Sequence, residues 1–107
     1  MIFSKQLWDE LVAQHDSVLL YLSGNDCGVC RTLEPKIKEL MENKFPKVKL
    51  VFLDADVNRE LAAQLRMLSI PGIVFYADGH EVFRANGLIH LSEFERKVER
   101  PYSLMYS

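Results

Sequence analysis

Apolar and polar positions follow one another along the chain in blocks whose period changes from helical to extended. In residues 4–14, Leu7, Leu11 and Val12 recur at helical spacing, which predicts an amphipathic helix capped by Ser4. Residues 17–23 form a short, continuous apolar run, which is typical of a strand buried on both faces of a sheet. We therefore expect a helix followed by a central strand.

The same alternation continues through the middle of the chain. Residues 30–45 predict a long helix, which Pro46 should end because proline cannot continue the backbone hydrogen bonds. Residues 48–54 predict the next strand and residues 58–68 the next helix. The apolar residues of these two helices that we expect to face the core are Leu33, Ile37, Met41, Leu61, Leu65 and Leu68.

The pattern changes after Pro71. Residues 72–87 predict two antiparallel strands joined at Asp78 and Gly79, a dipeptide that favours a tight hairpin turn. The order of elements is then helix, strand, helix, strand, helix, strand, strand, helix. This order predicts a three-layer α/β/α fold whose central mixed sheet ends in an antiparallel hairpin.

A last helix is expected after the hairpin. Ser92 and Glu95 have the spacing of a capping box at its start, and Pro101 should close it. The remaining tail, residues 101–107, is too short to be a module, and we expect it to fray or pack loosely. The chain has no internal repeat or low-complexity linker, which predicts one domain over residues 1–107.

Composition and charge exclude several classes of function. The chain has 13 Lys and Arg against 15 Asp and Glu, and no basic cluster interleaves with aromatic residues, which argues against nucleic-acid binding. The first residues turn acidic without a long apolar run, so we expect neither a secretory signal nor a membrane span. We expect a cytoplasmic monomer.

The chemistry of the chain is expected at its only two cysteines, Cys27 and Cys30. Cys27 stands where the buried strand gives way to a helix, so the unpaired N–H groups and the helix dipole should favour its thiolate. Cys30 lies almost one turn further along. A first turn loosened by Gly28 would let the two sulfur atoms form a disulfide.

Two other interpretations of the cysteines are open at this point. They could be inert core residues, although a core cysteine has no reason to lie at the mouth of a helix. They could also belong to a metal site. Zinc usually takes four protein ligands or three plus water, however, and His15, His80 and His90 are scattered along the chain.

The sequence resembles the thioredoxin family over essentially its whole length. The redox motif DCGVC and the loop SIPG carry most of the resemblance. The further matching residues are Pro35 within the helix after the motif, Asp56 before the next helix, and the hairpin glycines Gly79 and Gly87. The resemblance implies a thioredoxin-like fold with a cis Ile70–Pro71 peptide bond beside the cysteines.

The resemblance also implies an activity, namely dithiol–disulfide exchange. Cys27 would attack a protein disulfide and Cys30 would release the reduced product. The backbone of Ile70, next to Pro71, would pair with an extended substrate segment as in strand addition. No cofactor is expected beyond an external electron donor, such as an enzyme resembling thioredoxin reductase.

The first departure from the family pattern concerns the proton of the resolving cysteine. Tyr21 stands where the family commonly has a buried aspartate, and Phe52 stands where a lysine commonly accompanies it. Tyrosine is a poor base at neutral pH. An aromatic pair would therefore replace a costly buried polar pair. Glu34, one turn after Cys30, is a hypothetical replacement for the carboxylate, the alternative being a solvated glutamate.

Two further departures lie beside Cys27. Asp26 stands where the family usually has tryptophan; its charge should raise the pKa of the Cys27 thiol and favour partners with basic residues near their disulfide. The alternative is that Asp26 points to solvent and caps the helix. Val29 replaces the common proline, and it keeps an N–H that could donate to the thiolate while the first turn loses rigidity.

These observations favour a cytoplasmic thiol–disulfide oxidoreductase that acts as a reductase. The main alternative is a protein-binding module with the same fold and little redox turnover, which the missing base and the missing tryptophan favour. A zinc or iron–sulfur site shared between two chains is a further alternative. The intact cysteine pair and the proline loop argue for the enzyme.

Overall fold

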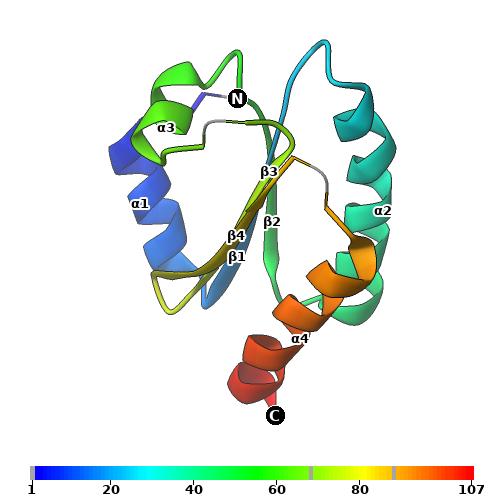
Figure 1. Ribbon diagram of the computed structural model, residues 1–107. Coiled ribbons are helices and arrows are strands. Elements are labelled where there is room, and N and C mark those ends of the chain that lie inside the picture. The colour runs from blue at the N-terminus through cyan, green and yellow to red at the C-terminus, as the bar shows by residue number, and fades with distance from the viewer. Residues whose placement is uncertain (1, 68, 88) are drawn as a thin grey trace.

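The computed structural model describes residues 2–67, 69–87 and 89–107. A four-stranded sheet lies between two pairs of helices, with α1 and α3 on one side and α2 and α4 on the other (Figure 1). The elements are α1 (Lys5–Gln14), β1 (Ser17–Ser23), α2 (Gly28–Lys44), β2 (Lys49–Asp54), α3 (Arg59–Gln64), β3 (Gly72–Ala77), β4 (His80–Asn86) and α4 (Leu91–Tyr106). Their order confirms the prediction. In the described part of the chain, no helix has the length and apolarity needed to cross a membrane.

The sheet is mixed, with the strand order β2-β1-β3-β4. β1 pairs in parallel with β2, Tyr21 lying opposite Phe52, while β1–β3 and β3–β4 are antiparallel. β1 is central because its apolar run can be covered on both faces, as the sequence predicts. The carboxyl end of β1 therefore leads into α2 at the top of the sheet in Figure 1.

The two faces of the sheet build two separate apolar clusters. Successive residues of a strand point to opposite faces, so alternate residues of β1 belong to different clusters. The cluster under α1 and α3 includes Trp8, Val12, Leu20, Leu22, Leu53, Leu61 and Val74. The cluster under α2 and α4 includes Leu19, Tyr21, Leu33, Ile37, Met41, Phe75 and Phe94. Leu68, which we expected to face inward, lies outside the described residues.

The buried stripe of α1 differs from the predicted one by one residue. Ser4 caps the helix as expected, its side-chain oxygen accepting from the N–H of Leu7 at 3.1 Å. Leu7 itself is 52% exposed, however, and the helix buries Trp8 and Val12. These two residues are one turn apart. The helix therefore turns its larger aromatic side chain to the sheet, and the expectation for Leu7 is wrong.

The third helix, α3, is shorter than the predicted helix over residues 58–68 because it ends in a complete Schellman motif. The N–H of Met67 donates to the carbonyl of Ala62 at 2.9 Å, and that of Arg66 donates to Ala63 at 3.0 Å. Arg66 has a φ of 59°, the left-handed conformation that such a cap requires and that arginine rarely adopts.

The hairpin turns where the sequence predicts. Asp78 and Gly79 have φ values of 51° and 80°, the left-handed pair that a two-residue turn between twisted strands requires. A bulge interrupts the β3–β4 ladder, because Tyr76 pairs with Glu81 and Phe75 pairs with Phe83.

The predicted start of the last helix is wrong in its details. His90 is the N-cap, and its side chain makes no capping hydrogen bond. Ser92 lies inside the first turn of α4, and Glu95 accepts from Lys44 Nζ at 2.8 Å. The capping box therefore does not form, because an ion pair with the end of α2 holds the glutamate.

The last helix also continues past its expected end. Pro101 lies inside α4, which runs to Tyr106, so the expectation that Pro101 closes the helix is wrong. The missing N–H of proline removes one helical hydrogen bond. Aromatic packing offsets it, because the ring of Tyr102 lies 5.1 Å from that of Phe45 and 4.7 Å from that of Tyr106. The hydroxyl groups of Tyr106 and Ser17 also lie 2.8 Å apart.

Candidate active site

The two cysteines form a disulfide at the start of α2. Cys27 is the N-cap with extended backbone angles, and Cys30 lies in the first turn, with 5.2 Å between the two Cα atoms. Cys30 is buried, whereas Cys27 is half-buried. The two sulfur atoms thus differ in accessibility, and only Cys27 is open to a partner molecule.

The sulfur of Cys27 takes the place of a capping oxygen. Its Sγ accepts from the N–H of Cys30 at 3.1 Å, where a serine or aspartate side chain usually accepts. The N–H that reaches Sγ is therefore that of Cys30, whereas we expected an added donor from Val29. A negative sulfur at this position would gain both from this bond and from the helix dipole.

A groove of about 320 Å³ opens beside this sulfur. The residues that line it are Asp26, Cys27, Gly28, Val29, Ile70, Pro71 and Gly87. The fold therefore brings together residues 26–29, the proline loop and the residue that follows β4. All of these except Gly87 are predicted from the sequence as site residues. Ile70–Pro71 is a cis peptide bond, as the resemblance implies.

The far wall of the groove is the proline loop. The carbonyl of Pro71 accepts from the N–H of Gly87 at 2.9 Å, which ties the loop to the end of the hairpin. Ile70 is 38% exposed and Val29 51% exposed, so the rim presents two aliphatic side chains. Asp26 is the one charged residue that lines the groove beside these two side chains.

Sequence reasoning missed Gly24, whose lack of a side chain leaves room for Ile70. A side-chain carbon at this position would collide with the side chain of Ile70. A glycine immediately after a buried strand was the available signal, because such a residue often marks a close approach. Asp56 also supports this loop, since its Oδ2 accepts from the N–H of Asn25 at 3.4 Å.

Tyr21 lies directly beneath the disulfide. Its hydroxyl donates to the backbone carbonyl of Cys30 at 3.0 Å, and its ring centroid lies 5.7 Å from that of Phe52. Burial, and then the negative charge of Glu34, raises the pKa of Tyr21 to about 12. Tyr21 is therefore a neutral donor at physiological pH, and the predicted aromatic pair does occupy this position.

Two carboxylates lie near the cysteines in different surroundings. Glu34 is half-buried, and its charge acts on the hydroxyl of Tyr21 beneath the disulfide. Asp26 is exposed and precedes the N-cap, which is Cys27, so the interpretation of Asp26 as the cap is wrong. Within the described residues, no three His, Cys, Asp or Glu side chains cluster as metal ligands would.

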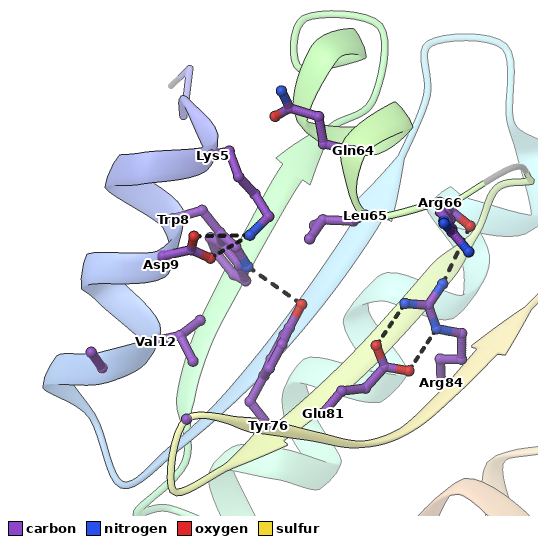
Figure 2. A pocket seen from close by; sticks show the side chains of 12 residues that line it. Lys5, Trp8, Asp9, Val12, Gln64, Leu65, Arg66, Tyr76, Glu81 and Arg84 are labelled. Carbon is purple, nitrogen blue, oxygen red and sulfur yellow. Dashed lines mark hydrogen bonds and ion pairs between the residues drawn. The ribbon is translucent and has the colours of Figure 1, made fainter.

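A second hollow, of about 430 Å³, lies between α1, α3 and the hairpin (Figure 2). Its charged side chains largely neutralise one another. Lys5 Nζ lies 2.7 Å from Asp9 Oδ1, and Arg84 donates to both carboxylate oxygens of Glu81 at 2.7 and 2.6 Å. Arg84 also donates to the carbonyl of Arg66 at 3.2 Å, which fixes the end of α3 against β4. The hollow shares no lining residue with the groove beside the disulfide.

A family model described as thioredoxin matches residues 1–100. The chain belongs to the thioredoxin family. Membership and the Cys27–Cys30 disulfide together make it a protein thiol–disulfide oxidoreductase. The predicted thioredoxin-like fold is confirmed by the solved thioredoxins that it resembles.

Relatives agree with the thioredoxin assignment, and a solved structure agrees with the fold. The chain is 28% identical over 96 residues to the thioredoxin-like protein YdfQ of Bacillus subtilis, covering 90% of this chain and 85% of YdfQ. It is 38% identical to thioredoxin H8 of Arabidopsis thaliana over 69% of this chain, but spans only 49% of that protein. The crystal structure of thioredoxin from Trypanosoma brucei brucei superposes with a TM-score of 0.83 at 21% identity, covering 96% of this chain and 90% of that one.

Proposed function

We propose that this thioredoxin-family chain reduces protein disulfides, with Cys27 as the nucleophile and Cys30 as the resolving cysteine. The observation that carries this assignment is the difference between the two sulfur atoms. Cys27 lines the groove, whereas Cys30 is buried, does not line the groove and is bonded through its sulfur to Cys27. The helix start also favours a negative charge on Cys27.

The exchange transfers two electrons in two steps. The Cys27 thiolate attacks one sulfur of the substrate disulfide, forming a mixed disulfide and expelling the other substrate sulfur as a thiolate. The Cys30 thiol then loses its proton and attacks Cys27 Sγ, which forms the Cys27–Cys30 disulfide and releases the second substrate thiolate. The substrate is reduced and the chain is oxidised.

A base is needed for the proton of Cys30, and we propose Glu34 for this role. Tyr21 does not qualify, because its raised pKa keeps its hydroxyl protonated. Glu34 is the carboxylate whose charge acts on Tyr21 beneath Cys30. Glu34→Gln should slow the release of substrate from a preformed mixed disulfide. An unchanged release rate would exclude Glu34 as the base.

The groove supports the binding of an extended substrate segment. The segment would pair with the backbone of Ile70 beside Pro71, as in strand addition, and its apolar side chains would contact Val29 and Ile70. Asp26 at the edge of the groove would favour substrates with a basic residue near the disulfide. The preferred substrate is thus apolar with a nearby positive charge.

The cycle requires an external donor to restore the dithiol. We propose a dithiol reductase resembling thioredoxin reductase, which would deliver two electrons through the same exchange chemistry. A reducing cytoplasm is the compartment in which such a cycle runs towards substrate reduction. The proposed cycle requires no cofactor beyond this donor.

The decisive experiment combines a redox titration with cysteine variants. The purified chain is equilibrated in glutathione buffers, its free thiols are trapped by alkylation, and its mass is measured. A reversible two-thiol transition at a potential near that of thioredoxins, about −270 mV, supports the reductase. Cys27→Ser should abolish reduction of a model protein disulfide, whereas Cys30→Ser should accumulate the mixed disulfide. A strongly oxidising potential would point to an oxidase or isomerase instead.

A second candidate function is a protein-binding module with little redox turnover. The neutral Tyr21 beneath Cys30 is the observation that favours it, because a missing base slows the resolving step. The two candidates differ in turnover. Binding of a protein disulfide without reduction, unchanged in Cys30→Ser, would favour the module, and catalytic turnover would exclude it.

A further inference from the structure

The proline loop, which carries Ile70 and Pro71, leads directly into the strand pair β3–β4. Gly72 pairs with Asn86, and the N–H of Gly87 donates to the carbonyl of Pro71 at 2.9 Å. Backbone hydrogen bonds therefore fix the end of the loop to the edge strand β4. The position of Ile70 also depends on how the segment before the loop is held.

The segment before the loop is held by a side chain of the same strand. Arg84 donates through Nη1 to the carbonyl of Arg66 at 3.2 Å and to the sulfur of Met67 at 3.5 Å. Figure 2 shows the guanidinium group of Arg84 directed towards Arg66. Arg66 is the residue in the left-handed conformation after α3, so this bond fixes the point at which the chain turns towards the loop. β4 thus holds the loop on both sides.

Met67 connects this contact to the wall of the groove. Its side chain is buried and belongs to the apolar cluster under α1 and α3. A side-chain carbon at Gly72 would collide with Cε of Met67, so the methyl group packs closely against the backbone of Gly72. Gly72 is bonded directly to Pro71. Met67 therefore contacts Arg84 through its sulfur and supports the residue next to Pro71 through its methyl group.

Glu81 holds the guanidinium group of Arg84 in the orientation that these contacts require. Nε and Nη2 of Arg84 donate to the two carboxylate oxygens of Glu81 at 2.7 and 2.6 Å, which leaves Nη1 for Arg66 and Met67. Residues three apart in a regular strand point to opposite faces of the sheet. The β4 bulge inserts Val82 between Glu81 and Arg84, so both charged side chains lie on the face under α1 and α3.

We propose that Arg84 is a positioning residue for substrate binding in the disulfide groove. Its bonds to Arg66 and Met67 set where the loop places Ile70. The backbone of Ile70 pairs with the substrate in the proposed function, on which this inference rests. A loop that is already ordered loses less entropy when a substrate binds, so Arg84 acts on affinity and not on the exchange chemistry. Arg84 lines the second hollow and not the groove, so it acts only through the loop.

The kinetic test compares Arg84→Gln with the matched control Lys5→Gln. Lys5 also forms an ion pair in the second hollow, and its side chain is 41% exposed against 31% for Arg84. With insulin as the protein disulfide, Arg84→Gln should raise KM about fivefold and leave kcat unchanged, whereas Lys5→Gln should change neither. The rate with hydroxyethyl disulfide, which is too small to pair with the loop, should be the same in the unchanged chain and in both variants.

Two further measurements separate geometry from charge. Arg84→Lys keeps the positive charge but lacks the planar fork that reaches a carboxylate and a carbonyl together, so it should raise KM as Arg84→Gln does. The amides of Met67 and Gly87 form hydrogen bonds on the two sides of the loop. Their hydrogen exchange should become about tenfold faster in Arg84→Gln and stay unchanged in Lys5→Gln. Circular dichroism verifies that the variants are folded.

The outcomes distinguish this inference from the proposed function. If the unchanged chain reduces no protein disulfide, the proposed function fails, and the exchange rates of Met67 and Gly87 still decide whether Arg84 holds the loop. An unchanged KM in Arg84→Gln, an equal rise in Lys5→Gln, or unchanged exchange of both amides would each overturn the role of Arg84. A parallel fall in kcat and in the rate with hydroxyethyl disulfide would also overturn it, because the damage would then lie at the cysteines.

Discussion

Replacing Tyr21 by phenylalanine removes one oxygen atom from beneath the disulfide and leaves the ring in place. The lost interaction is the hydrogen bond from the hydroxyl to the carbonyl of Cys30 at 3.0 Å, in a fully buried position. A neutral hydrogen bond of this kind contributes about 1 kcal/mol to the free energy of unfolding. The folded-to-unfolded ratio should therefore fall about fivefold, and Tm should fall by about 4–8 °C.

The same variant should change how stability depends on alkaline pH. The pKa of Tyr21 is raised from 10.0 to about 12 in the folded chain, first by burial and then by the charge of Glu34. The unfolded chain loses this proton at a lower pH than the folded chain does. The contribution of Tyr21 to stability is therefore complete below about pH 10 and is lost as the pH rises towards 12. The free energy of unfolding of the Tyr21→Phe variant should therefore decrease less steeply over this range than that of the unchanged chain.

The assay is urea unfolding of the oxidised form, followed by circular dichroism at neutral pH and at a series of pH values above 9. Release of substrate from the mixed disulfide is measured in parallel. Because Tyr21 stays protonated at neutral pH, the variant should keep the pH dependence of this release. The reasoning would be refuted if the variant kept its stability but its rate of substrate release no longer changed with pH near neutrality. That result would show that Tyr21 acts as a base.

Three other substitutions test separate parts of the structure. Arg66→Gly should raise the free energy of unfolding by about 1 kcal/mol, because glycine adopts the left-handed cap without strain; a loss of stability in urea unfolding would contradict this. Asp26→Asn should lower the pKa of the Cys27 thiol, measured by thiolate absorbance against pH, since it removes a nearby negative charge; a higher pKa would contradict the assigned effect. Gly24→Ala should lower kcat/KM for a protein disulfide while the chain stays folded, because the added carbon displaces Ile70; unchanged kinetics would show that Ile70 does not shape the groove.

Much of the fold could be predicted because the apolar periods are long and regular. β1 and α2 lie where the sequence predicts them. A short, continuous apolar run can be buried as a central strand, and an apolar stripe at helical spacing can be buried as one face of a helix. Helix ends were harder to predict. Pro101 and Ser92 carry strong local signals, but tertiary contacts of Tyr102 and Glu95 outweigh them.

Some features of the candidate site could likewise be predicted from neighbouring residues, whereas others depend on contacts between segments that are distant in sequence. The strand-to-helix position of Cys27 could be predicted from the sequence around it, and the cis bond before Pro71 was implied by family resemblance alone. The contact of Tyr21 with the carbonyl of Cys30 could not be predicted, because it depends on how closely β1 packs beneath α2. The position of Ile70 against Gly24 likewise depends on two segments that are distant in sequence.

The sulfur that caps α2 makes the amide of Cys30 a spectroscopic sensor of the redox state. In the oxidised chain this amide donates to Cys27 Sγ at 3.1 Å. A thiolate is a stronger acceptor than a neutral sulfur. The amide proton of Cys30 should therefore resonate further downfield and exchange more slowly in the reduced, ionised chain. One amide signal would then report in real time, without a label, when the disulfide opens and when the Cys27 thiolate forms.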